Sequence, residues 1–279
     1  MPVGTAFICT ACGQQYPEAD APPEGCKICL DGRQYVPASG QGWTSSPALS
    51  ARHFGTWRMH EPGLYGFGIS PKFAIGQRAL FVSTGEGLIL WDLVPFLDEA
   101  TREIVASLGG IKAIAISHPH YYSNLVEWSR AFGDVPVYLH ENDRSWVTRP
   151  DPCIVHWSGD SRELAPGVTI VRTGGHFEGA SVLHWAAGAE GAGVLLTGDS
   201  VQVGPDRRVS FMRSYPNMVP LNEASVASIS ATLEPLAFER IYGAFFESVV
   251  PREAKIVFRE SVRRYLAALK GDYRLPGNG

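Results

Sequence analysis

From about residue 50 onward, short apolar stretches typical of β-strands alternate with longer segments that have the apolar spacing of amphipathic helices. Glycine, proline and polar residues separate these segments and mark the turns between them. Strands with helices between them predict a layered α/β architecture. The strands are expected at residues 65–70, 79–83, 87–92, 111–117, 135–140, 168–172, 180–185, 194–197 and 239–242, and the helices at residues 96–108, 124–132, 224–236 and 254–269.

Local signals set some of the boundaries. Gly109 and Gly110 end the helix over residues 96–108, and Ser123 is the predicted N-cap of the helix over residues 124–132. The proline- and glycine-containing stretch over residues 37–42 is typical of a linker. We therefore predict two domains, a small one over residues 1–40 and a larger one over residues 41–279.

Composition narrows the class of protein. The chain has 279 residues, is 45% hydrophobic and 19% charged, and carries a formal net charge of −4. This charge argues against nucleic acid or an anionic membrane surface as a partner. No apolar run approaches the ~20 residues that a membrane span needs, and no signal peptide is evident. We therefore expect a cytoplasmic protein.

Four of the five cysteines lie in the first 29 residues, as two Cys-x-x-Cys pairs: Cys9 with Cys12, and Cys26 with Cys29. This spacing predicts a tetrahedral thiolate site, and such a short segment needs the metal for its folding energy. The sequence therefore predicts a zinc ribbon that packs onto the larger domain or onto another subunit, as in a homodimer.

Iron is the alternative metal for the four cysteines. The segment from Cys9 to Gly13 is similar to a rubredoxin knuckle, in which iron carries electrons. However, no glycine directly follows Cys29, and the two pairs are close together for a rubredoxin. Zinc is therefore the preferred assignment.

A second group of metal-ligand residues occurs in the larger domain. His118 and His120 follow an apolar run at alternate positions, which on a strand would place both imidazoles on one face. His176 follows two glycines that permit a tight turn, and Asp199 follows the apolar run over residues 194–196. His118 and His120 could therefore bind one metal ion together.

The order and setting of these residues resemble those of the metallo-β-lactamase superfamily over residues 50–270. The resemblance implies a four-layer αβ/βα sandwich with metals at one edge of the sheets. It also implies that His118, His120 and His176 bind one metal and that Asp199 matches the carboxylate that bridges two metals.

Three positions depart from the family pattern. Tyr122 and Ser123 stand where the family motif His-x-His-x-Asp-His has aspartate and histidine, and the late family histidine has no counterpart among residues 240–247. Because all ligands specific to the second metal are missing, we expect one metal, zinc or iron, at this site.

Three imidazoles and a water around one zinc form a known hydrolytic arrangement. The predicted function is therefore a metal-dependent hydrolase of a small molecule, with Asp199 as a metal ligand or general base. A non-catalytic ligand-binding descendant is the main alternative. A mononuclear iron oxygenase or redox protein is another, because two histidines and a carboxylate suit ferrous iron. Tyr122, Arg213 and Tyr215 are candidate substrate-binding residues.

Overall fold

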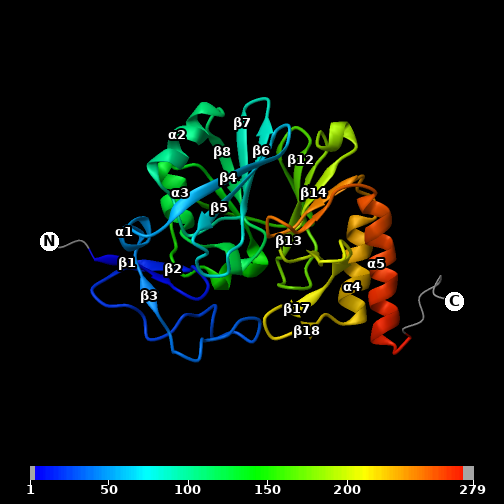
Figure 1. Ribbon diagram of the computed structural model, residues 1–279, viewed down its shortest axis with the longest axis horizontal. Helices are drawn as coiled ribbons and strands as arrows, with labels where there is room; N and C mark the ends of the chain where they lie inside the picture. The colour runs from blue at the N-terminus through cyan, green and yellow to red at the C-terminus, as the bar shows by residue number, and fades with distance from the viewer. Residues whose placement is uncertain (1–3, 273–279) are drawn as a thin grey trace.

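The computed structural model describes residues 4–272; the outermost parts of the two predicted domains, residues 1–3 and 273–279, lie outside the described residues. Two β-sheets face each other at the centre of the molecule, and a layer of helices covers the outer face of each (Figure 1). This order of layers confirms the predicted αβ/βα sandwich. A small third sheet lies beneath the first of the two large sheets in Figure 1.

The first large sheet has seven strands in the order β10-β9-β8-β7-β6-β5-β4. Its strands β7 to β10 are parallel, and β4 to β7 form an antiparallel meander. The strands are β4 (Phe54–Glu61), β5 (Leu64–Ser70), β6 (Ala79–Thr84), β7 (Gly87–Trp91), β8 (Ile111–Ala115), β9 (Val137–His140) and β10 (Ile154–Trp157), and the helices on this side are α1 (Ser46–Ser50), α2 (Glu99–Ser107) and α3 (Leu125–Ala131).

The second large sheet has six strands in the order β11-β12-β13-β14-β19-β20, of which β14 and β19 are parallel. Helices α4 and α5 pack on its outer face, at the right of Figure 1. These elements are β11 (Ser161–Ala165), β12 (Val168–Arg172), β13 (Ser181–Trp185), β14 (Val194–Leu196), β19 (Arg240–Tyr242), β20 (Val249–Val250), α4 (Glu223–Leu233) and α5 (Ala254–Leu269).

Short elements complete the chain. Strands β1 (Thr5–Cys9), β2 (Gln15–Ala19) and β3 (Trp43–Thr44) form the small sheet, so that sheet contains residues from both sides of the predicted boundary at residue 40. Two ribbons consist of β15 (Gln202–Val203) with β16 (Val209–Ser210), and of β17 (Met212–Ser214) with β18 (Val219–Pro220). Short stretches of 3₁₀-helix cover Pro119–Tyr121, Glu141–Trp146 and Ala189–Gly191.

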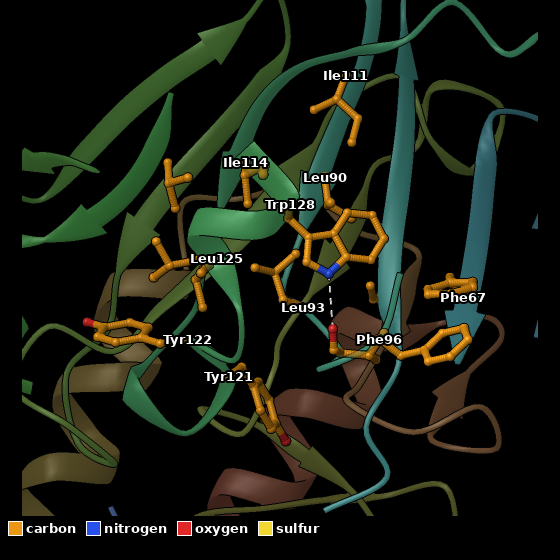
Figure 2. Close-up of a cluster of buried hydrophobic side chains, with 14 of the residues drawn as sticks. Phe67, Leu90, Leu93, Phe96, Ile111, Ile114, Tyr121, Tyr122, Leu125 and Trp128 are labelled. Carbon is orange, nitrogen blue, oxygen red and sulfur yellow. Dashed lines mark hydrogen bonds between the residues drawn. The ribbon is translucent and has the colours of Figure 1, made fainter. Parts of the chain in front are cut away.

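Apolar side chains fill the three spaces between the layers. Leu183 and Trp91 lie in the core between the two sheets, and Phe258 of α5 lies in the core outside the second sheet. Trp128 of α3 is the largest side chain of the core outside the first sheet, and its indole N–H donates to the Val94 carbonyl at 3.1 Å (Figure 2). Burying an aromatic side chain of this size stabilises a fold by about 3–5 kcal/mol relative to alanine.

Several predicted boundaries need correction. Helix α2 begins after Asp98, whose carboxylate accepts from the Thr101 N–H at 2.8 Å, so residues 96 and 97 precede the helix. The N-cap of α3 is Asn124, because Ser123 has a positive φ of 48°. Strand β8 ends at Ala115, two residues before the predicted end. Within residues 4–272, no helix is long and apolar enough to cross a membrane.

Candidate metal centre

His118 and His120 lie beyond the end of β8. His118 has extended backbone angles, and His120 lies in the 3₁₀ turn Pro119–Tyr121. The sequence analysis expected both imidazoles on one face of a strand; this was wrong, because the turn brings them together instead. Their ring centroids are 4.9 Å apart. Asp92 helps to fix this turn, because its carboxylate accepts from the Ser117 N–H at 2.7 Å. Burial raises the pKa of Asp92 to about 6.

His176 is held by a glycine turn between β12 and β13. Gly174 and Gly175 have φ of 65° and 83°, and a Cβ on Gly175 would lie 2.9 Å from side-chain atoms of Ile229 and Leu221. The Nδ1 of His176 lies 3.0 Å from the Met212 carbonyl oxygen. Because a carbonyl only accepts, Nδ1 carries the proton, and Nε2 keeps a lone pair for a ligand.

Asp199 follows β14 through the turn at Gly198. The Tyr121 hydroxyl donates to Oδ1 of Asp199 at 2.8 Å, while Oδ2 lies 3.5 Å from Nε2 of His118. The Tyr215 hydroxyl donates to the backbone carbonyl of Asp199, also at 2.8 Å. Tyr121 therefore fixes the carboxylate and Tyr215 fixes the backbone of Asp199, with one carboxylate oxygen directed at the histidines.

The three imidazoles and the carboxylate converge, with one potential ligand atom from each within 4.8 Å of the others. Nε2 of His176 lies 3.3 Å from Nδ1 of His120, and the buried Nε2 of His118 has no hydrogen-bond partner within the described chain. Unpartnered imidazole nitrogens in a buried cluster cost free energy unless another group satisfies them. Three nitrogens and one carboxylate oxygen are a donor set that suits zinc or iron, so the residues fit a metal ion.

The protonation state of the cluster favours metal binding. Burial lowers the pKa of His176 to about 3, and burial lowers that of His120 well below its ordinary value. Burial alone would raise the pKa of Asp199, but its contacts with His118, His176 and Tyr121 bring it below its ordinary value. Near neutral pH these two imidazoles are neutral and the carboxylate is ionised, which are the forms that ligate metals.

A cavity of about 230 Å³ opens onto His120, His176 and Asp199. One wall comes from the cysteine-rich N-terminal segment, and the opposite walls come from the larger domain. The other residues that line it are Ala11, Gln34, Tyr35, Lys72, Ala74, Ile75, Gln202, Tyr215, Pro216 and Phe245. The site is therefore open to a small molecule.

The three candidate substrate-binding residues lie in different places. Tyr215 lines the cavity, whereas Arg213 is exposed and does not line it. Tyr122 is 1% exposed, belongs to the core under α3 and points away from Tyr121 (Figure 2). The sequence analysis missed Tyr121 and Gln34, although the tyrosine stands inside the histidine motif, where its place next to His120 was the available signal.

The region of the missing second-metal ligands is occupied by other contacts. Ser123 is buried, and its carbonyl accepts from the Gln15 N–H at 3.2 Å. The buried guanidinium of Arg78 donates to the Gly243 carbonyl at 2.9 Å and 3.1 Å, which holds the loop after β19. Phe245 from this loop lines the cavity.

The four cysteines of the N-terminal segment also converge. All four side chains are buried, and one sulfur from each lies within 4.8 Å of the others. Sγ of Cys9 lies 3.6 Å from Sγ of Cys29, and Sγ of Cys12 lies 3.5 Å from Sγ of Cys26. The Gln41 amide donates to Sγ of Cys9 at 3.0 Å. Four buried sulfurs at these distances fit a tetrahedral metal ion, as in a zinc ribbon.

Comparison with known proteins agrees with this fold and site. The sequence matches the metallo-β-lactamase superfamily over residues 75–277, and the chain belongs to that superfamily. A relative from Bacillus subtilis (strain 168), the uncharacterized protein YmaE, is 44% identical over 269 residues, which cover 95% of this chain and 97% of the relative.

Solved structures show the same fold at low sequence identity. VMB-1 superposes with a TM-score of 0.57 at 15% identity, covering 77% of this chain and 98% of its own. The metallo-β-lactamase FIM-1 from Pseudomonas aeruginosa, solved in a mono-zinc form, has a TM-score of 0.53 at 12% identity, covering 75% of this chain and 95% of its own. At these identities the likeness concerns the fold alone.

Proposed function

We propose that the protein is a hydrolase with a single metal ion held by His118, His120 and His176, and that Asp199 assists as a ligand or as a proton acceptor. The observation that carries this proposal is the hydrogen bond from Tyr121 to Oδ1 of Asp199. It uses the carboxylate oxygen that a second metal would need, in a site that already lacks the other second-metal ligands. The mono-zinc form of FIM-1 supports a single ion in this fold.

A zinc ion held by three imidazoles supplies a Lewis acid and lowers the pKa of water to ~7. The residues of the chain supply the remaining requirements. Asp199 is ionised, and its Oδ2 faces the histidines, so it can accept a proton there. The hydroxyl of Tyr215 fixes the backbone of this base.

The cavity also favours a class of substrate. Its volume of about 230 Å³ suits a small molecule rather than a polymer segment. Lys72 is the lining residue that carries a positive charge, whereas Ile75, Ala74 and Phe245 are apolar. We therefore propose a small substrate that has an apolar body and an anionic group near Lys72.

Replacing His176 by alanine tests the function. The zinc-loaded wild-type protein is expected to hydrolyse slowly at least one member of a panel of small anionic esters, thioesters and lactams. His176→Ala should remove one metal ion per chain and lower kcat/KM at least 100-fold, because one of the three nitrogen ligands is lost. Steady-state kinetics and elemental analysis measure both effects.

His156→Gln is the matched control, because His156 lies on the outer strand β10 and does not line the cavity. It should keep both the metal content and the activity. Turnover that survives in the His176 variant, or two ions at the histidine site of the wild type, would contradict the proposal.

A further inference from the structure

Arg33 belongs to the N-terminal segment but is buried against the histidine site. Its side chain is 4% exposed. Its Nε donates to the backbone carbonyl of His176 at 2.8 Å, and its guanidinium lies 4.2 Å from the ring centroid of Phe177. Its Nη1 donates to Asp31 at 3.0 Å. Arg33 therefore holds the turn that carries a predicted metal ligand.

The backbone around Arg33 is fixed to the larger domain. Ser214 donates through its hydroxyl to the Arg33 carbonyl at 2.9 Å, and the Asn217 amide donates to the carbonyls of Gly32 and Gln34 at 3.2 Å and 2.9 Å. We call residues 32–35 the Arg33 segment. Both donors of this contact belong to β17 and the turn that follows it, and the Met212 carbonyl of the same strand accepts from His176.

The Arg33 segment also reaches the histidine site directly. Nε2 of Gln34 lies 3.5 Å from Nδ1 of His120, and the side chains of Gln34 and Tyr35 line the cavity. Two of the three imidazoles thus have neighbours in this segment. The segment is both a wall of the cavity and a support for the ligands.

The position of the Arg33 segment depends on the cysteine site. It starts three residues after Cys29, and the Gln34 N–H donates to the Asp31 carbonyl within the same turn. The apolar cluster around the cysteines contains the four cysteines and Ile28 as its buried members, whereas Ile8 packs in the core of the larger domain. Because so small a core supplies little stability, a metal on the thiolates would supply most of the folding energy of this segment.

We infer that the two metal sites are energetically coupled through Arg33, so that metal on the four cysteines positions His176 and tightens metal binding at the histidine site. This inference rests on the proposed function only in taking the histidine cluster as a metal site. Coupling of this kind is reciprocal, so metal on the histidines also tightens binding to the cysteines by the same factor. The cysteine site is then part of the functional centre.

Cobalt(II) titration of the full-length protein tests the coupling. Thiolate-to-metal charge-transfer bands report the cysteine site, and ligand-field bands of a nitrogen and oxygen site report the histidines. The dissociation constant of the histidine site should be at least tenfold higher in Cys29→Ser, whose cysteine site cannot bind metal as the intact site does, than in the wild type. Arg33→Met should weaken the histidine site to a similar extent even with the cysteine site loaded.

Two further variants isolate the role of Arg33. Arg33→Lys keeps the charge and one donor, so it should recover part of the lost affinity. Arg102→Met changes an exposed arginine on α2 and should bind cobalt as the wild type does. An unchanged histidine-site affinity in Arg33→Met or in Cys29→Ser would overturn the inference.

Amide hydrogen exchange gives a readout that does not need metal at the histidines. Zinc on the cysteines should slow exchange over residues 173–180 in the wild type and should have no effect there in Arg33→Met. Equal protection in both proteins would overturn the coupling. Absence of hydrolysis with the coupling intact would instead count against the proposed function alone.

Discussion

Tyr121 decides how Asp199 can act. Its buried hydroxyl donates to Oδ1 of Asp199, and its ring centroid lies 4.4 Å from that of His118. The same residue therefore orients the carboxylate and packs against an imidazole. The hydrogen bond leaves Oδ2 as the oxygen that faces the histidines.

Tyr121→Phe should weaken metal binding at the histidine site about tenfold, because groups that orient a ligand contribute on this scale. It should also lower the free energy of unfolding by about 1 kcal/mol through the loss of one buried hydrogen bond. Cobalt titration and urea unfolding measure the two effects. Tyr122→Phe, in the neighbouring core position, should leave the metal affinity unchanged. Equal affinities for the Tyr121 variant and the wild type would show that the hydroxyl does not position Asp199.

At the residue scale the sequence predicts the ligands better than their neighbours. His118, His120, His176 and Asp199 were predicted from their resemblance to the superfamily pattern, and the structure brings the four together. Arg33 and Gln34 could not be assigned in this way, because they reach the site across more than 80 positions of sequence. Their contacts depend on how the N-terminal segment packs, which no local pattern encodes.

At the scale of elements, the turns after strands place the ligands. Gly198 joins β14 to Asp199 with φ of 51°, and a Cβ there would lie 2.5 Å from Oγ and 2.8 Å from Cβ of Ser117. This close approach brings the turn of Asp199 against the turn of His118. A side chain at Gly198 would force the two turns apart.

Gly198→Ala should therefore lower both the stability and the metal affinity. Gly110→Ala is the matched control, because Gly110 also has a positive φ but has open space around its Cβ position. The control should lose about 1 kcal/mol from backbone strain alone. Gly198→Ala should lose about 1–3 kcal/mol more from the overlap. Thermal unfolding and cobalt binding of the two variants would show equal losses if the close approach had no effect.

Regular elements with clear periodicity are predictable, and edge elements are not. The bounds of β12 and α5 agree with the sequence prediction, because each has an apolar pattern ended by turn residues. Strand β4 was missed, because it lies at the edge of the first sheet and exposes Phe54 and Met59, so its apolar residues do not alternate. Antiparallel pairing with β5 along its whole length, rather than local sequence preference, makes β4 a strand.

At the scale of the whole molecule, the buried Arg78 and the half-buried His60 form a basic pair where the two sheets meet. Arg78 at the start of β6 donates to the loop after β19 and to Nε2 of His60 on β4, the latter at 2.8 Å. Burial, together with the charge of Arg78, lowers the pKa of His60 to about 4. The imidazole is therefore neutral in the folded protein at neutral pH and accepts from the guanidinium.

This pair predicts a loss of stability in acid. As the pH falls through 6.5, His60 takes up a proton in the unfolded chain, whereas in the folded protein it does so only near pH 4. The unfolded state binds more protons between these values, so stability falls as the pH is lowered from 6.5 to 4. His60→Gln, which keeps an acceptor for Arg78, should reduce this fall. Melting temperatures of metal-free wild type and variant between pH 7.5 and 4.5 test it, and parallel curves would contradict it.

The cavity beside the histidines crosses the point at residue 75 where the likeness to the superfamily begins. Five lining residues precede that point: Ala11, Gln34, Tyr35, Lys72 and Ala74. A fragment that starts at residue 75 would keep the four predicted ligands but lose these lining residues and Arg33, which holds the turn of His176. The cavity therefore extends beyond the part of the chain that matches the superfamily model. Joining its first 74 residues to another member of the superfamily would test whether they carry substrate selectivity, because they contribute to the cavity lining but contain none of the four predicted ligands of the histidine site.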